Sequence, residues 1–228
     1  AACMATGHYV RRVMGPDGAE LHRAADPTRD QSYFLFATTR EQLDFLRFPL
    51  GDLPKTAVRE IGAALGVKTA EKPDSQDICF VPTGKYQQVV EKLRPGAMAS
   101  GEIVHVDGRV LGRHDGIINY TIGQRRGLNI AIGEPLFVVR LDAAAKRVIV
   151  GPREALMVSD IVLKETNWLA PPQDGQTVLA RVRSTRAPVP GSLRMSPSGR
   201  HAVHLDVSEE GVAPGQAVTA HATPLFDI

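Results

Sequence analysis

The stretch that decides the fold of this chain is GEIVHVDGRVLG, residues 101–112. Two runs of alternating apolar and polar residues flank the dipeptide Asp107-Gly108. Such a dipeptide favours the tight turn of a β-hairpin, because both residue types tolerate the positive φ angles that these turns need. The sequence therefore predicts a hairpin here, and the apolar pattern stays strand-like from this point to the C-terminus.

Further strand signals follow the hairpin. Residues 134–151, EPLFVVRLDAAAKRVIVG, indicate a second pair of strands. After residue 159, short apolar runs alternate with turns rich in proline and glycine, which is typical of a small antiparallel barrel or sandwich. These runs are DIVL (160–163), TVLARVRS (177–184), HAVHLDV (201–207) and QAVTAHA (216–222).

Before residue 101 the apolar residues follow a helical period instead. Residues 33–48 carry them at helix-compatible positions. A clearer amphipathic stripe, with the spacing i, i+3, i+7, is formed by Val58, Ile61 and Leu65. Pro54 suits the first turn of this second helix and Gly66 suits its left-handed end.

Composition sets broad limits on the kind of protein. The chain has 228 residues, of which 43% are hydrophobic and 23% charged, as in soluble proteins with one large or two to three small domains. The net charge of +2 permits nucleic-acid binding without arguing for it. The absence of a long apolar run and the presence of two cysteines, Cys3 and Cys79, predict a cytoplasmic protein with no membrane span and no bound metal. Residues 1–10 read as a half-buried strand, so we expect the chain to be cut from a longer protein.

Cys79 is the first candidate for chemistry. Its neighbours Ile78, Phe80 and Val81 favour a buried core thiol, whereas the polar run before it places the thiol where a loop enters a strand, a common site for function. Lys72 is the nearby cation that would favour a reactive thiolate. We interpret Cys3, which lies among small apolar residues, as structural.

Several short polar motifs have both a structural and a functional interpretation. Gly7-His8 is either a plain turn or a point where a ligand approaches the backbone at the end of a strand. Arg29-Asp30-Gln31 is either a solvated helix start or a contact site. Arg125 and Arg126, in a glycine-flanked loop, either face phosphates or form surface salt bridges.

Arginines also alternate in the run at residues 177–184. A strand there would bury Val178, Ala180 and Val182 and leave Arg181 and Arg183 on the solvent side. Taken alone, these residues support a soluble, RNA-binding protein with one candidate reactive cysteine.

In order, several runs resemble the tRNA-specific 2-thiouridylase family, which modifies the wobble uridine. The runs DSQDICFVP (74–82) and YTIGQRRGL (120–128) are the most specific. The others are ATGHYVR (5–11), RDQSYFLF (29–36), FPLGDLPKTAVREIGAALG (48–66), the longer run around residues 101–128 and VAPGQAV (212–218).

The resemblance implies a multidomain fold. It places the C-terminal part of an α/β ATP-pyrophosphatase domain, of the adenine nucleotide alpha-hydrolase type, at residues 1–84. A small β-rich central domain follows at 85–152, and an antiparallel β-barrel at 153–228. The implied activity is tRNA-uridine 2-sulfurtransfer, in which ATP with Mg²⁺ adenylates the uridine and a cysteine persulfide, loaded by a sulfur-relay protein, delivers the sulfur.

The resemblance also implies residue roles. Cys79 matches the persulfide cysteine and Gly7 a backbone contact to ATP. The positions that match tRNA contacts are His8, Arg29, Asp30, Gln31, Arg183, Ser184 and Gln216. Arg29 stands where the family usually has lysine, and Ser184 where it often has tyrosine. The family's phosphate loop, catalytic aspartate and second cysteine would precede residue 1, so we expect this chain to be inactive by itself.

Two rival functions remain open from the sequence. One is a non-catalytic RNA-binding module. The other is a thiol-redox protein that uses Cys79, although a resolving thiol is usually nearby in such proteins and Cys3 is far away in sequence.

Overall fold

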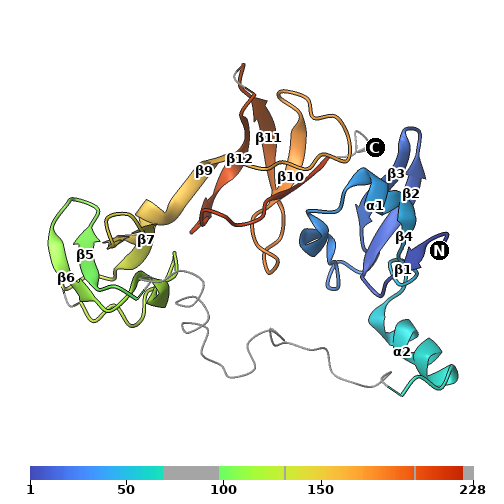
Figure 1. Ribbon diagram of the computed structural model, residues 1–228, viewed down its shortest axis with the longest axis horizontal. Helices are drawn as coiled ribbons and strands as arrows, with labels where there is room; N and C mark the ends of the chain where they lie inside the picture. Colours follow the sequence, from blue (N-terminus) through green and yellow to red (C-terminus); the bar gives the residue numbers. More distant parts are fainter. Residues whose placement is uncertain (69–97, 131, 198, 223–228) are drawn as a thin grey trace. The chain divides into compact units, whose positions relative to one another are not determined.

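The computed structural model describes residues 1–68, 98–130, 132–197 and 199–222 (Figure 1). These residues form two compact units. Unit 1 comprises the described residues within 1–75, 160–207 and 216–228, and unit 2 those within 76–159 and 208–215.

The N-terminal part of unit 1 contains two small sheets and two helices. Its elements are β1 (Met4–Ala5), β2 (Val10–Gly15), β3 (Gly18–Arg23), the 3-10 helix η1 (Ser32–Leu35), α1 (Arg40–Phe45), β4 (Leu46–Arg47) and α2 (Lys55–Ala64). Strand β1 pairs with β4 in parallel, and β2 pairs with β3 as a hairpin. Their core consists of Val10, Ala19, Leu43 and Phe48.

The helical pattern of residues 33–48 is interrupted in the structure. Thr39 has an extended backbone, and its hydroxyl accepts a hydrogen bond from the Gln42 amide while the Gln42 side chain accepts one from the Thr39 amide. This capping box makes Arg40 the first residue of α1. The two side chains satisfy the backbone amides of Thr39 and Gln42, so the chain before Thr39 does not need to be helical.

The second helix agrees with its sequence signals. Pro54 is the N-cap of α2, and Gly66 follows the helix with φ +68°, the left-handed conformation expected at its end. The prediction for residues 1–10 was wrong for the described chain. Both residues of β1 are exposed, because among the described residues this strand pairs only with β4.

The C-terminal part of unit 1 is a five-stranded antiparallel sheet with the order β13-β10-β11-β12-β9 (Figure 1). Its strands are β9 (Met157–Val162), β10 (Thr177–Arg181), β11 (Val189–Met195), β12 (His201–Glu210) and β13 (Thr219–Ala222). The alternation predicted for 177–184 is confirmed on the inner face, where Val178, Ala180 and Val182 are buried. The expected closed barrel is not formed by the described residues, since β13 and β9 are the two edges of the sheet.

Unit 2 contains a four-stranded sheet with the order β6-β5-β8-β7. Its elements are β5 (Gly101–His105), β6 (Val110–His114), η2 (Ile117–Asn119), β7 (Phe137–Asp142), β8 (Arg147–Gly151) and η3 (Arg153–Leu156). Both predicted hairpins are confirmed, and Gly108 has φ +94° in the first turn. The parallel pairing of β5 with β8, which joins the hairpins, has no local sequence signal.

No helix of the described residues has the length and apolar character needed to cross a membrane.

Candidate functional site

The segments around His8 and Gln31 lie side by side in unit 1. The Tyr9 amide donates a hydrogen bond to the Gln31 side-chain oxygen at 2.9 Å, and the Gln31 amide donates to the Tyr9 carbonyl at 3.0 Å. His8 is half-buried, and its Nδ1 atom lies 2.7 Å from the Thr6 hydroxyl. Two motifs that are 22 residues apart in sequence therefore form one local surface.

Gly7 is exposed beside this surface. A Cβ atom built at Gly7 would lie 3.7 Å from Leu50 Cδ1, an ordinary van der Waals contact. Packing within the described chain therefore does not require glycine at this position, and an approaching ligand remains a reason for it.

The side chain of Asp30 is fully buried, with 0% of its surface exposed. Its carboxylate accepts hydrogen bonds from Ser32, through both the amide and the hydroxyl, and from the Ala24 amide. It also pairs with Arg23 at 3.2 Å and with Arg181 at 3.1 Å. Burial raises the pKa of Asp30, but the hydrogen bonds from Ser32, Ala24 and Arg23 outweigh it and hold the pKa below its usual value.

Arg181 is not on the solvent side, contrary to the prediction. Its side chain is 11% exposed and makes the ion pair with Asp30. The alternation along β10 does place Arg181 opposite Val178, Ala180 and Val182, but the segment around Asp30 packs on that second face. A pattern of period two distinguishes the faces of a strand without showing what covers each of them.

The Arg181 guanidinium also organises the chain that follows β10. Its Nε atom donates to the carbonyls of Arg186, at 2.8 Å, and of Arg183, at 3.2 Å. Its Nη2 atom donates to the Ser184 carbonyl at 2.5 Å. The two predicted contact residues in this turn, Arg183 and Ser184, are both half-buried.

Tyr33 joins the turn to the segment that carries Gln216. Its hydroxyl lies 3.2 Å from the Val182 carbonyl and 2.9 Å from the Ala217 carbonyl. Gln216 is half-buried, and Arg29 is exposed next to Asp30. Tyr33 lies within the family motif RDQSYFLF, yet a bridging role had no sequence signal because its partners are 149 and 184 residues away.

We call the five residues Tyr9, Asp30, Gln31, Tyr33 and Arg181 the contact network. It brings together the predicted residues at positions 7–8, 29–31, 183–184 and 216. Of the candidate sites, only Cys79 lies outside the described residues. Cys3 is exposed, so its interpretation as a core thiol was wrong for the described chain.

The loop with Arg125 and Arg126 lies in unit 2. The Gln124 side chain accepts a hydrogen bond from the Thr121 amide and donates one to the Arg126 carbonyl, and Gly123 and Gly127 have positive φ angles. Both arginines are exposed. This braced loop keeps its predicted ability to present guanidinium groups outward.

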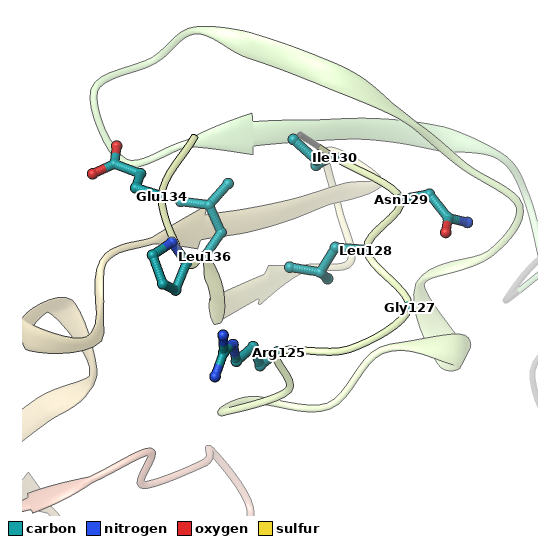
Figure 2. A pocket seen from close by; sticks show the side chains of 8 residues that line it. Arg125, Gly127, Leu128, Asn129, Ile130, Glu134 and Leu136 are labelled. Atoms are coloured by element: carbon teal, nitrogen blue, oxygen red, sulfur yellow. The ribbon is translucent and has the colours of Figure 1, made fainter. Parts of the chain in front are cut away.

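An open hollow of about 410 Å³ borders the same loop. Figure 2 shows Arg125 and Glu134 on different sides of it, with the buried residues Leu128 and Leu136 between them. The hollow thus has an apolar floor and a charged group of each sign at its rim.

Comparison with protein families gives three consecutive matches along the chain. They are a tRNA methyl transferase HUP domain at residues 1–83, a tRNA methyl transferase PRC-barrel domain at 87–152 and an aminomethyltransferase beta-barrel domain at 158–221. The order agrees with the multidomain arrangement that the sequence predicted.

Individual relatives are more specific. The chain is 63% identical over 227 residues to the tRNA-specific 2-thiouridylase MnmA of Hyphomonas neptunium, covering 97% of this chain and 57% of the relative. It is 62% identical to the enzymes of the same name from Maricaulis maris and Caulobacter vibrioides, covering 98% and 95% of this chain and 55% and 59% of those proteins.

The chain belongs to the tRNA-specific 2-thiouridylase family. It spans between 55% and 59% of the length of these three 2-thiouridylases. The family name agrees with the resemblance of the quoted motifs, whereas two of the domain descriptions speak of methyl transfer. The relatives match nearly the whole chain at 62–63% identity, so we use their family name rather than the domain descriptions.

Proposed function

We propose that the full-length protein that carries this chain converts the wobble uridine of tRNA to 2-thiouridine. Identity above 60% to three proteins named tRNA-specific 2-thiouridylase supports this activity. The observation that carries it in the structure is the contact network, because one set of hydrogen bonds joins four segments with predicted tRNA contacts.

In the proposed reaction ATP, with Mg²⁺, activates the uridine by adenylating its O2 atom, with release of pyrophosphate. The sulfane sulfur carried by Cys79 then bonds to C2, and AMP leaves. A second thiolate attacks Cys79 and forms a disulfide with it, which leaves the sulfur on the base. A persulfide donor protein loads Cys79 again after the disulfide has been reduced.

The role of the contact network in this proposal is to hold together the segments that bind tRNA. Arg29 and Arg183 provide positive charge for the phosphates, and His8, Gln31 and Gln216 provide hydrogen-bonding groups beside them. The exposed loop with Arg125 and Arg126 supplies a further basic element in unit 2. A cytoplasmic location fits a tRNA-modifying enzyme of this kind.

We assign the three expected domains, at 1–84, 85–152 and 153–228, to the nucleotide-binding, central and barrel regions of this enzyme. Gly7 would contact ATP through its backbone. That role is supported by the packing around Gly7, where a Cβ atom would make an ordinary contact with Leu50 at 3.7 Å, so the fold itself does not require glycine.

The second candidate function is a non-catalytic RNA-binding module. It is favoured by the absence of a Ser-Gly-Gly-Val-Asp-Ser-type phosphate loop within the 228 residues. We therefore propose that these 228 residues alone bind tRNA without thiolating it.

Nucleoside mass spectrometry separates the two functions. Unmodified tRNA transcript with uridine at the first anticodon position is incubated with ATP, Mg²⁺ and a persulfide donor protein, and then digested. The full-length protein should form 2-thiouridine, and the 228-residue chain should not. Absence of 2-thiouridine with the full-length protein and a loaded donor would overturn the proposed function, and pyrophosphate release by the chain alone would overturn its proposed inactivity.

A further inference from the structure

The side chain of Arg181 connects two segments that are far apart in sequence. On one side it pairs with Asp30, 151 residues away. On the other it donates to three carbonyls of the turn after β10, those of Arg183, Ser184 and Arg186. A guanidinium group has five N–H donors in a fixed planar arrangement, so one side chain holds all four acceptors in a defined geometry.

This arrangement sets the shape of the turn. Strand β10 ends at Arg181, so the carbonyls beyond it leave the regular ladder of the sheet. Buried or half-buried carbonyls need a donor, and Arg181 supplies it for three of them. The positions of the Arg183 and Ser184 side chains therefore depend on the Arg181 guanidinium.

Asp30 fixes the guanidinium in turn. Its side chain is 0% exposed, and its carboxylate accepts hydrogen bonds from protein donors on Arg23, Ala24, Ser32 and Arg181. A carboxylate is also a poor neighbour for RNA phosphates, because the two carry the same charge. Asp30 is thus better suited to hold Arg181 than to contact RNA.

We propose that Arg181 and Asp30 are positioning residues for tRNA binding, which aim the Arg183-Ser184 turn at the RNA backbone without touching the RNA themselves. This proposal rests on the proposed function, since it names how the same surface is shaped. It changes the role of Asp30 from a tRNA contact to an anchor, and it gives Arg181 a role that its motif did not indicate.

The direction in which Asp30→Asn changes tRNA affinity distinguishes a residue that holds Arg181 from one that contacts a phosphate. If Asp30 lay against an RNA phosphate, Asp30→Asn would remove a repulsive charge and leave affinity unchanged or higher. If Asp30 holds Arg181, Asp30→Asn weakens the pair and lets the turn move, so affinity falls although the protein has become more positive. The asparagine is nearly isosteric and keeps an oxygen for Ala24 and Ser32.

The experiment measures affinity for unmodified tRNA transcript across a salt series in the full-length protein. The variants are Asp30→Asn, Arg181→Lys, Arg183→Ala and the two doubles that combine Arg183→Ala with each of the others. Arg194→Lys is the matched control, because Arg194 on the neighbouring strand β11 also pairs with an aspartate, Asp160, but at 3.6 Å and with both side chains more than half exposed. Thermal unfolding of each variant shows that it is folded at the assay temperature.

We expect Asp30→Asn and Arg181→Lys each to weaken binding by about tenfold, the scale of one charge-assisted contact. Each should also lower the salt slope by about one, as Arg183→Ala does, although Arg181→Lys keeps its charge. Once Arg183 is alanine, either change should cost less than about twofold more. Arg194→Lys should bind as the unchanged protein does.

Two results would overturn the positioning role while leaving the function intact. In one, Arg183→Ala weakens binding but the costs of the other changes simply add to it, which indicates independent RNA contacts or a general loss of structure. In the other, Asp30→Asn binds as well as the unchanged protein. By contrast, unchanged affinity for Arg183→Ala itself would remove this surface from the proposed function, and the positioning role with it.

Discussion

The Nη1 atom of Arg181 lies 3.1 Å from the Oδ2 atom of Asp30, whose side chain has no solvent-exposed surface. This pair joins the segment after β3 to the last residue of β10, within one compact unit. A charge pair removed from water in this way depends on complete hydrogen bonding, and both partners have further contacts.

The buried pair predicts a strong and asymmetric effect on stability. Arg181→Met should lower the free energy of unfolding of unit 1 by about 3 kcal/mol, because it leaves a buried carboxylate without its counter-ion. Combining it with Asp30→Asn should recover part of this loss, since the uncompensated charge is then gone. Urea unfolding of the single and double variants measures both effects, and Arg194→Met, at an exposed pair, should cost less than about 1 kcal/mol. Equal effects at the two sites would contradict the structural importance of the pair.

Removal of the Arg183 charge should weaken tRNA binding with little effect on the free energy of unfolding. Arg183→Ala should weaken tRNA binding and reduce the dependence of log Kd on log salt by about one counterion. The free energy of unfolding should change by less than about 1 kcal/mol, because the side chain is half-buried rather than part of the core. A salt series from low to physiological ionic strength gives the slope, and identical slopes for the two proteins would mean that this turn does not face phosphates.

Much of the local structure could be predicted from the sequence, because its signals are local. Pro54 and Gly66 bracket α2, and Asp107-Gly108 marks the first turn of unit 2. The resemblance to a family also pointed to positions 8, 29–31, 183 and 216, whose tRNA contacts stay a prediction.

What the sequence could not predict are the contacts between distant segments. The alternation of apolar and polar residues along β10 identified a polar face, but it did not identify the segment that covers this face. Arg181 was therefore predicted to face solvent, whereas its side chain is only 11% exposed. For the same reason the bridge from Tyr33 to Ala217, 184 residues away, had no sequence signal. The extent of β1 was overestimated because small apolar residues favour a buried strand only where another layer covers it.

Substitution of Gly7 should change the KM for ATP without changing the stability of the fold. Gly7→Ala should alter the free energy of unfolding by less than about 0.5 kcal/mol, since the new Cβ atom would make an ordinary contact with Leu50 at 3.7 Å. In the full-length protein it should raise the KM for ATP by about tenfold, the effect of one lost contact of about 1.4 kcal/mol. Steady-state thiolation at varied ATP tests this, with Gly66→Ala as a control that acts on folding alone because Gly66 has φ +68°. An unchanged KM would remove Gly7 from the ATP site.

Titration of the buried His221 should make the stability of the fold depend on pH. Burial lowers its pKa below 6.5, the nearby charges of Arg23, Arg181 and His22 lower it further, and Asp30 acts in the opposite direction. Between the lowered folded-state pKa and about 6.5 the unfolded chain binds more protons at this site, so stability should fall as the pH decreases through that interval. None of the described residues hydrogen-bonds its buried Nε2 atom, which is consistent with a neutral ring.

His221→Gln should remove this part of the pH dependence. Unfolding measured from pH 7.5 to pH 5 should show a smaller slope for the variant than for the unchanged protein. Equal slopes would place the titrating groups elsewhere.

We propose above all that Cys79 carries the sulfur that is placed on tRNA, while the contact network holds together the segments that bind the tRNA. The most direct measurement is the yield of 2-thiouridine, by nucleoside mass spectrometry, from the full-length protein and its Cys79→Ser variant with the same persulfide donor. We predict no 2-thiouridine from the serine variant, because a hydroxyl cannot carry sulfane sulfur, and nearly unchanged tRNA affinity, because the substitution is close to isosteric. Formation of 2-thiouridine by Cys79→Ser at a rate similar to that of the unchanged protein would contradict the claim.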